Sequence, residues 1–243
     1  MANPNEKVDL YFSAVAKTFP PKVQEALRMI GDPALGAGPD SRARQLLALR
    51  RYVRKAKGLE AQWVWSHEQI KHYEASPEFA RVRTEIAKVK NQFEELNPGY
   101  TLGVSPIRDL HRQVALWNGN KTVHAAAEGL KRKCLQEAAS YPDRPDSNTT
   151  ERFRTFLGHC AVDPEPTSAA PGLSDHGQMH AIDFVVKQGE RTIADTVSKT
   201  IGAQWDAPGW TQKLNDAVRL SKSLFSHEYL QHPREPWHYK LQR

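Results

Sequence analysis

The sequence predicts an α+β fold: a small antiparallel sheet with flanking helices, preceded by a helical N-terminal module. Two observations predict it. Residues 1–97 carry apolar residues at helical spacing between Pro and Gly breaks, and the short runs rich in β-branched and aromatic residues follow Gly99. A length of 243 residues allows one large domain or two small ones. We therefore expect a helical module at 1–97 and a second domain at 98–243, divided at Asn97-Pro98-Gly99.

The N-terminal module is expected to be helical throughout. Helices are predicted at 8–17 and 21–30, where Pro21 suits a helix start. Ser66 with Gln69 three residues later is typical of a capping box. Ser76-Pro77 opens a further helix that reaches Leu96, and five apolar residues form its buried stripe: Phe79, Val82, Ile86, Val89 and Phe93.

A strongly basic helix is predicted at 41–57. Leu46, Leu49 and Tyr52 recur at helical spacing, with Arg and Lys residues around them. We favour a helix that faces a core and keeps a solvated basic side. A docking surface for an anionic polymer is the alternative.

The second domain begins with a strand at 100–104. Ser105-Pro106 is expected to cap a helix that ends near Trp117. Helices at 122–140 and 149–159 follow. The segment 118–170 is expected to form either a lid or a support for a cleft.

Three further strands are predicted at 180–186, 192–196 and 237–241, with a helix at 208–225 before the last one. Period-two alternation in the first of these strands places Ile182, Phe184 and Val186 on a core face. It places Ala181, Asp183 and Val185 on the opposite face.

The segments S-D-H-G-Q-M-H-A-I-D and E-P-W-H carry the candidate metal ligands. Zinc in a hydrolase takes three protein ligands from His and Asp or Glu, and a water fills the fourth position. His176, Asp183 and His238 supply this set, so Zn²⁺ is the expected cofactor. Glu235 is the candidate general base beside the metal.

The positions of these residues in the fold also follow from the sequence. His176 is expected in the loop that enters the strand of Asp183. Glu235 precedes a proline, which favours extended backbone. Glu235 and His238 are an odd number of residues apart, so one flat strand would place them on opposite faces. We therefore expect Glu235 in a loop and His238 inside the last strand.

Together the two segments resemble the zinc D-Ala-D-Ala carboxypeptidases and dipeptidases, a family that includes vancomycin-resistance enzymes and phage endolysins. The family pattern is Ser-x-His-x-x-Gly-x-Ala-x-Asp, followed by Glu-x-x-His near the C-terminus. The matching positions are Ser174, His176, Ala181, Asp183, Glu235, Trp237 and His238. Met179 occupies the position where the family usually has Gly, so a side chain there is expected to narrow the site or shift the loop.

A third match lies upstream, in Y-T-L-G-V-S-P-I-R-D-L-H-R-Q. It is similar to the family's strand, Arg and following helix, with Gln113 five residues after Arg108. The resemblance implies that Arg108 contacts the substrate near the scissile carbonyl or a carboxylate, groups that a guanidinium recognises well. Ser174, Gln113 and Trp237 are carried over as further substrate-binding positions.

Composition limits the partners and the location. The net charge of +6 suits an anionic partner but does not choose between cell-wall polymer, nucleic acid and membrane surface. No apolar run approaches the roughly 18 residues of a membrane span, and the N-terminus lacks a signal-peptide pattern. Cys134 and Cys160 have no CxxC spacing, and a disulfide between them is not implied.

The resemblance implies a zinc metallopeptidase that hydrolyses a bond involving D-Ala in the peptide stem of peptidoglycan. We do not expect a nucleic-acid partner. We expect synthesis in the cytoplasm and action at the cell wall or periplasm after non-classical export, injection or lysis. This would suit an endolysin or a delivered toxin, and the N-terminal module would then meet the delivery machinery. The alternative is a non-catalytic zinc protein that grips an anionic polymer through its basic helix.

Overall fold

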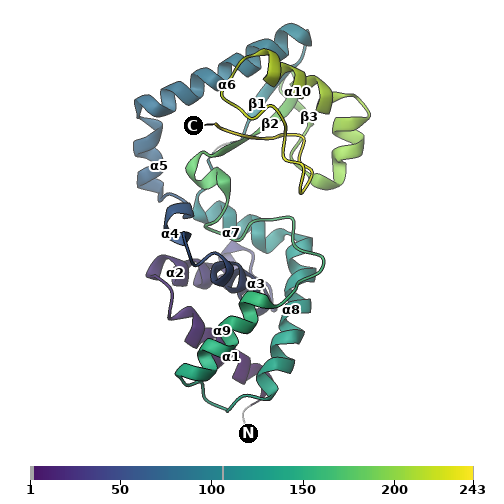
Figure 1. Cartoon of the computed structure of the whole chain (residues 1–243). Coiled ribbons are helices and arrows are strands. Elements are labelled where there is room, and N and C mark those ends of the chain that lie inside the picture. The colour runs from purple at the N-terminus through teal and green to yellow at the C-terminus, as the bar shows by residue number, and fades with distance from the viewer. Residues whose placement is uncertain (1–2, 106, 243) are drawn as a thin grey trace. The chain divides into compact units, whose positions relative to one another are not determined.

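The structure is a computed structural model, and it describes residues 3–105 and 107–242. It has the predicted α+β class. The chain folds into two compact units, each built from two chain segments (Figure 1). We call Met1–Val64 with Arg108–Ser174 the helical unit, and Trp65–Ile107 with Asp175–Arg243 the sheet unit. The single boundary predicted after residue 97 therefore differs from the observed division.

The division differs because tertiary packing crosses the predicted boundary in both directions. Val89 and Phe93 belong to the predicted N-terminal module, yet they are buried in the core of the sheet unit with Trp210 and Leu214. Conversely, residues 110–159 fold with the N-terminal helices. The segment 118–170, expected to be a lid or a support for a cleft, lies wholly in the helical unit.

In the helical unit, α3 contacts α1, α2, α8 and α9 (Figure 1). Cys134 and Cys160 are buried free thiols in this unit. No helix in the described parts of the chain is long and apolar enough to cross a membrane. The helices of this unit are α1 Pro4–Ala16, α2 Pro21–Ile30, η1 Pro33–Leu35, α3 Ser41–Arg54, α4 Leu59–Gln62, α7 Leu110–Gly119, α8 Lys121–Ala139 and α9 Ser147–His159.

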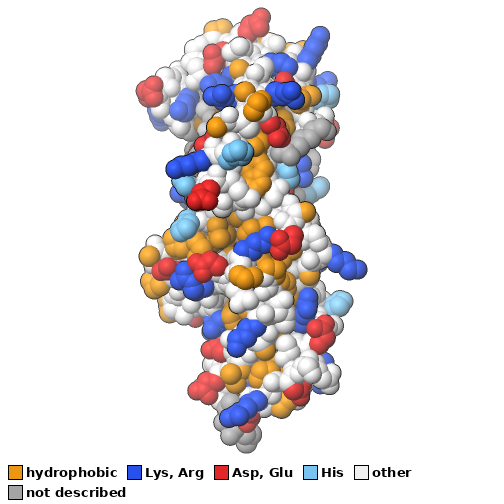
Figure 2. Space-filling model, turned by 90° about the vertical axis from the view of Figure 1, so that its left-hand side faces the viewer, with side chains coloured by type: hydrophobic (Ala, Val, Ile, Leu, Met, Phe, Trp, Pro, Cys, Tyr) orange, Lys and Arg blue, Asp and Glu red, His pale blue; other side chains and the backbone are white. Residues whose placement is uncertain are grey.

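The basic helix α3 directs much of its positive charge inward. Arg44 and Arg50 are buried. Arg50 donates from Nη2 to Glu165 Oε1 over 2.9 Å, and Arg51 and Arg54 pair with the same carboxylate. On the face drawn in Figure 2, Lys and Arg side chains are interspersed with Asp and Glu. These arginines therefore support the helical unit more than they form a free basic surface.

The sheet unit is organised around β2. Three strands pair with it, all antiparallel: β1 along Phe184–Lys187, β3 along Val186–Gln188 and β4 along Ala181–Asp183. The helix α6 packs on β1 and α10 (Figure 1). The elements of this unit are α5 His67–Glu74, α6 Pro77–Leu96, β1 Thr101–Val104, η2 Asp175–Gln178, β2 Ala181–Gln188, β3 Arg191–Ala194, η3 Ser198–Thr200, η4 Ile201–Asp206, α10 Trp210–Leu220 and β4 His238–Lys240.

The alternation predicted for β2 is confirmed. Ile182, Phe184 and Val186 are buried in the core of the sheet unit. Ala181 and Asp183, on the opposite face, are buried as well. Both faces of β2 are thus closed at its N-terminal end, where the candidate ligand Asp183 lies.

The start of α7 differs from the sequence prediction. This helix begins at Leu110, and the Asp109 carboxylate caps it by accepting the Arg112 N–H over 2.8 Å. Ser105 instead donates its N–H to Asp183 O over 3.0 Å and continues the pairing of β1 with β2. The predicted cap at Ser105-Pro106 falls partly on Pro106, which lies outside the described residues.

Candidate metal centre

Three side chains from separate elements meet in the sheet unit. His176 comes from η2, Asp183 from β2 and His238 from the start of β4. All three are buried, and one potential ligand atom from each lies within 4.8 Å of the other two. Within the described ranges, this is the His, Cys, Asp and Glu grouping that fits a metal ion. It is the ligand set predicted from the sequence.

Strand register brings Asp183 and His238 together. They are directly opposite each other in the antiparallel pair of β2 and β4. Side chains at such positions share one face of the sheet, with Cβ atoms about 4.5–5.5 Å apart. Accordingly, His238 Nδ1 lies 3.0 Å from Asp183 Oδ1. A shift of one residue in this register would turn one of the two side chains to the other face.

A short turn delivers His176 to the same place. The His180 N–H donates to Asp175 O over 2.9 Å and closes η2 just before β2. The Trp65 N–H donates to Gly177 O over 3.1 Å, next to His176. As a result, His176 Nε2 lies 3.3 Å from Asp183 Oδ1.

Met179 completes this turn in the left-handed region, with φ of 54°. A glycine adopts this backbone without steric cost, which gives a physical reason for the Gly of the family pattern at this position. The Met179 side chain is buried in the core of the sheet unit. It therefore fills the core beneath the turn.

The two ligand-atom separations that involve Asp183 suit a tetrahedral metal. Metal–ligand distances of about 2.0–2.2 Å place two ligand atoms about 3.3–3.5 Å apart at tetrahedral angles. Asp183 Oδ1 lies 3.3 Å from His176 Nε2 and 3.0 Å from His238 Nδ1, and both distances are close to that value. One carboxylate between two imidazoles provides one negative charge for a divalent cation.

The His238 ring presents one nitrogen to the cluster. That atom is Nδ1, which lies 3.0 Å from Asp183 Oδ1. The His238 ring contacts the His176 ring edge-on, with centroids 4.9 Å apart and planes at 88°. Two imidazoles and one carboxylate are a ligand set that zinc accepts, so the residues present fit a bound metal ion.

Glu235 lies beside this cluster, as predicted. Its Oε2 is 3.8 Å from His238 Nδ1, and its side chain is 19% exposed. Its backbone N–H donates to Leu230 O over 2.8 Å in the loop before β4. The placement of Glu235 in a loop and of His238 in the last strand is thus confirmed. Glu235 therefore lies next to the three residues that could hold a metal ion.

The other predicted site residues have different surroundings. Arg108, Gln113 and Ser174 belong to the helical unit. The Gln113 amide is buried and occupied, because Nε2 donates to Arg108 O over 2.7 Å and Oε1 accepts the Gly172 N–H over 2.8 Å. Trp237 is buried against Trp205, with ring centroids 5.9 Å apart. Gln113 and Trp237 therefore hold local structure, and their side chains are not presented to a substrate.

Comparisons with known proteins leave this chain without a match. No protein-family model matches it, and neither does any curated protein or solved structure. The likeness to zinc peptidases therefore rests on the motif residues, and the structure brings together four of them, His176, Asp183, Glu235 and His238.

Proposed function

We propose that this protein is a zinc-dependent peptidase that hydrolyses a stem-peptide bond involving D-Ala in peptidoglycan. The observation that carries the proposal is the buried group of His176, Asp183 and His238 with Glu235 beside it. A structural zinc site is closed by four protein ligands, whereas a catalytic site has three and leaves one position open. Three ligands and an adjacent carboxylate support catalysis.

Each residue has a defined role in this proposal. His176, Asp183 and His238 would hold the zinc. A bound zinc ion lowers the pKa of water from 15.7 to about 7 and polarises a carbonyl oxygen. Glu235 takes the proton of the attacking water and then delivers it to the leaving amine. Its position in a loop allows the carboxylate to serve both steps without being a ligand.

Zinc has one main competitor for this ligand set. Two His and one carboxylate also bind non-haem iron(II) in oxygenases. The general base beside the cluster favours zinc, since hydrolysis needs a proton acceptor. Elemental analysis of the purified protein decides between them, and we expect about one zinc per chain.

The substrate class comes from the family resemblance. Arg108 remains the candidate for binding a substrate carboxylate, as planar guanidinium groups do. Carboxypeptidase and endopeptidase action both fit the proposal. An endolysin or a toxin delivered into a rival cell would use the endopeptidase form.

The deciding experiment digests purified peptidoglycan and weighs the released fragments. We expect the wild type to release products of cleavage next to D-Ala. His176→Ala and His238→Ala should lose both zinc and activity. Glu235→Gln should keep zinc and lose most turnover, because only proton transfer is removed. Near-normal turnover by Glu235→Gln would place the base elsewhere, and unchanged zinc in both His variants would refute the ligand set.

A non-catalytic zinc protein that grips an anionic polymer is the second candidate. Its basic helix α3, however, uses Arg50 and Arg51 to bind Glu165, and Arg44 is buried. Stoichiometric zinc with no hydrolysis of any peptidoglycan fragment would favour it over the peptidase.

A further inference from the structure

The residues on either side of the Glu235-Pro236 pair contact two consecutive residues at the end of η4. This element is a π-helix at Ile201–Asp206, a form found frequently at functional sites. Asp206 pairs with Arg234, and Trp205 packs on Trp237. We call these two contacts the η4 clamp. The clamp therefore fixes the chain both before and after Glu235, the candidate base.

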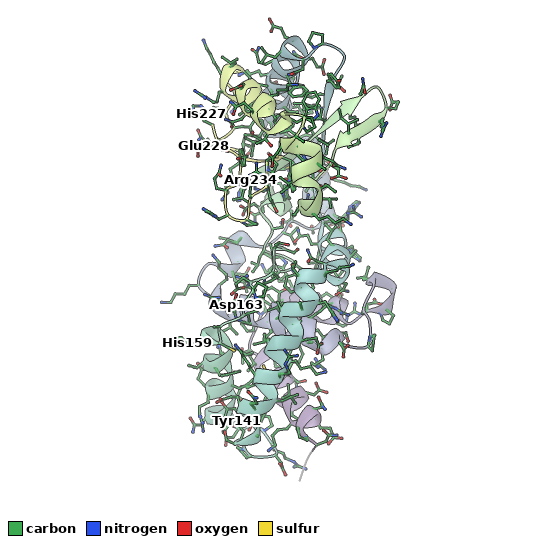
Figure 3. The ribbon with its side chains drawn as sticks, turned by 90° about the vertical axis from the view of Figure 1, so that its right-hand side faces the viewer. Tyr141, His159, Asp163, His227, Glu228 and Arg234 are labelled. Atoms are coloured by element: carbon green, nitrogen blue, oxygen red, sulfur yellow. The ribbon has the colours of Figure 1, made fainter. Side chains whose placement is uncertain are left out.

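The polar half of the clamp is a two-bond ion pair. Arg234 donates from Nη1 to Asp206 Oδ2 over 2.9 Å and from Nη2 to Asp206 Oδ1 over 2.7 Å. Thr211 donates from Oγ1 to Asp206 Oδ1 over 2.8 Å and orients the carboxylate. The Arg234 guanidinium also lies 5.8 Å from the centroid of the Tyr229 ring. Figure 3 views the side of the sheet unit that carries Arg234.

The apolar half of the clamp is buried. Trp205 is fully buried and Trp237 is 2% exposed. Trp205 Nε1 donates to Asp195 O over 2.7 Å, which fixes its ring from the strand side. The Trp237 carbonyl accepts the Phe184 N–H over 2.9 Å. Trp237 is thus attached to β2 next to Asp183, whereas Arg234 depends on Asp206.

Backbone hydrogen bonds join the loop that carries Glu235 to itself and to β4, including one from the His238 N–H to Glu235 O over 3.0 Å. The Leu230 N–H donates to His238 O over 3.0 Å, and the Glu235 N–H donates to Leu230 O. Residues 231–234 between them are exposed. The Arg234–Asp206 pair therefore joins this exposed segment, directly before Glu235, to an element outside the loop.

We propose that Asp206 and Arg234 are positioning residues that hold Glu235 at its working distance from the metal centre. The inference rests on the proposed function, in which Glu235 is the base. A displacement of about 1 Å in an active site can cost about 100-fold in rate. An exposed ion pair contributes little to stability, but a bidentate pair adds geometric specificity.

The chemistry of the pair suggests two conservative variants. Lysine keeps the charge of Arg234 but cannot form the planar two-bond contact, so Arg234→Lys tests geometry. Asp206→Asn keeps the shape and removes the charge. The matched control is Arg28→Lys, because Arg28 forms a similar two-bond pair with Glu25 in the helical unit.

The kinetic experiment is a double-mutant cycle on stem peptides. Arg234→Lys and Asp206→Asn should lower kcat by about 10- to 100-fold, as expected for a misplaced base. KM and zinc content should stay unchanged, and Arg28→Lys should behave as wild type. In the Glu235→Gln background the same substitutions should have no further effect. Equal losses in both backgrounds would overturn the positioning role.

A second readout does not depend on activity. Amide hydrogen exchange at Glu235 and Leu230 should be faster in Arg234→Lys and Asp206→Asn than in the wild type. Thr211→Val removes only the hydrogen bond that orients Asp206, so it should give a smaller increase in the exchange rate. This milder variant keeps the test valid if either of the other two fails to fold. Unchanged exchange in all three would refute the clamp. An inactive wild type with faster exchange in the variants would instead refute the proposed function and leave the clamp supported.

Discussion

Met179 combines a strained backbone with a well-buried side chain. It has a positive φ of 54° and a side chain buried in the core of the sheet unit. A non-glycine residue in this region costs about 1–2 kcal/mol. Loss of a buried Met side chain costs about 2–5 kcal/mol. Filling the core stabilises the protein by more than the backbone strain costs, so Met is tolerated where the family pattern has Gly.

This comparison predicts an order of stabilities at residue 179. Met179→Gly should destabilise the protein by about 1–3 kcal/mol, because the lost core packing outweighs the relieved backbone strain. Met179→Ala should be less stable than Met179→Gly, because it loses the side chain and keeps the strained backbone. Thermal unfolding of the three proteins at one pH measures the order. An alanine variant that equals or exceeds the glycine variant would show that the turn is not strained.

At the scale of elements, helix caps predicted from the sequence form as expected in α5 and α6. Ser66 and Gln69 make the reciprocal capping box, and Ser76 accepts the Phe79 N–H over 3.1 Å. The capping box of α9, in which Asp146 accepts the Thr149 N–H over 2.7 Å, was not predicted from the sequence. The residue types were visible in the sequence, but the helix was predicted to start at Thr149.

The Asp146 cap predicts a pH dependence. The Thr149 N–H and hydroxyl hold the pKa of this carboxyl below its ordinary value, which is about 3.9. A carboxyl with a lowered pKa stabilises the folded state above its ordinary pKa, and this contribution is lost as the pH falls through the lowered value. Asp146→Asn keeps a good cap without a charge.

The measurement compares unfolding of the wild type and Asp146→Asn from pH 6 to pH 2.5. Other carboxylates titrate equally in both proteins, so the difference between them isolates Asp146. We expect the stability advantage of the wild type to shrink as the pH falls below about 4, the ordinary range for this group. A difference that stays constant with pH would exclude the charged cap.

At the scale of the whole molecule, the division into two units gives a test with matched side chains. Phe93 and Phe153 are both fully buried, Phe93 in the sheet unit and Phe153 in the helical unit. Each Phe→Ala change should cost about 3–5 kcal/mol. Phe93→Ala should weaken zinc retention, because it loosens the unit that holds the ligands, and Phe153→Ala should leave it unchanged. Zinc content after dialysis against a chelator measures both. If the boundary lay after residue 97, Phe153→Ala would weaken zinc retention and Phe93→Ala would not.

Arg108 gives a second prediction at this scale, because the family resemblance implies that it binds the substrate. If Arg108 binds the substrate, Arg108→Lys keeps the charge but cannot form the planar two-bond contact. The loss of one charge-assisted hydrogen bond, worth about 1.5–3 kcal/mol, corresponds to a loss in kcat/KM of about 10- to 100-fold. Zinc content should not change. The exposed Arg112 on α7 provides the control, and Arg112→Lys should keep full activity. Equal kcat/KM for both variants would contradict the role implied by the family resemblance.

The fold class, most helices and the group of His176, Asp183 and His238 that could hold a metal were predictable from the sequence. The helices and strands were predictable because alternation and caps act over a few residues. The ligand group was predictable from its residue types, which suit zinc, although His238 lies 55 positions from Asp183. The register that places Asp183 opposite His238 came from the structure alone. The loop position of Glu235 was predictable, because its neighbours in the sequence restrict it to the loop before β4.

The remaining features depend on packing between distant segments. The helix α6 packs with the sheet, whereas α8 and α9 pack with the N-terminal helices. Which apolar faces pack together cannot be read from a local sequence pattern. The inward arginines of α3 and the occupied amide of Gln113 depend on partners more than 50 residues away in the chain. The pairing of Arg234 with Asp206 likewise joins residues 28 positions apart. Such contacts are set by packing in three dimensions, whereas the chain alone fixes only what lies within a helix turn or along a strand.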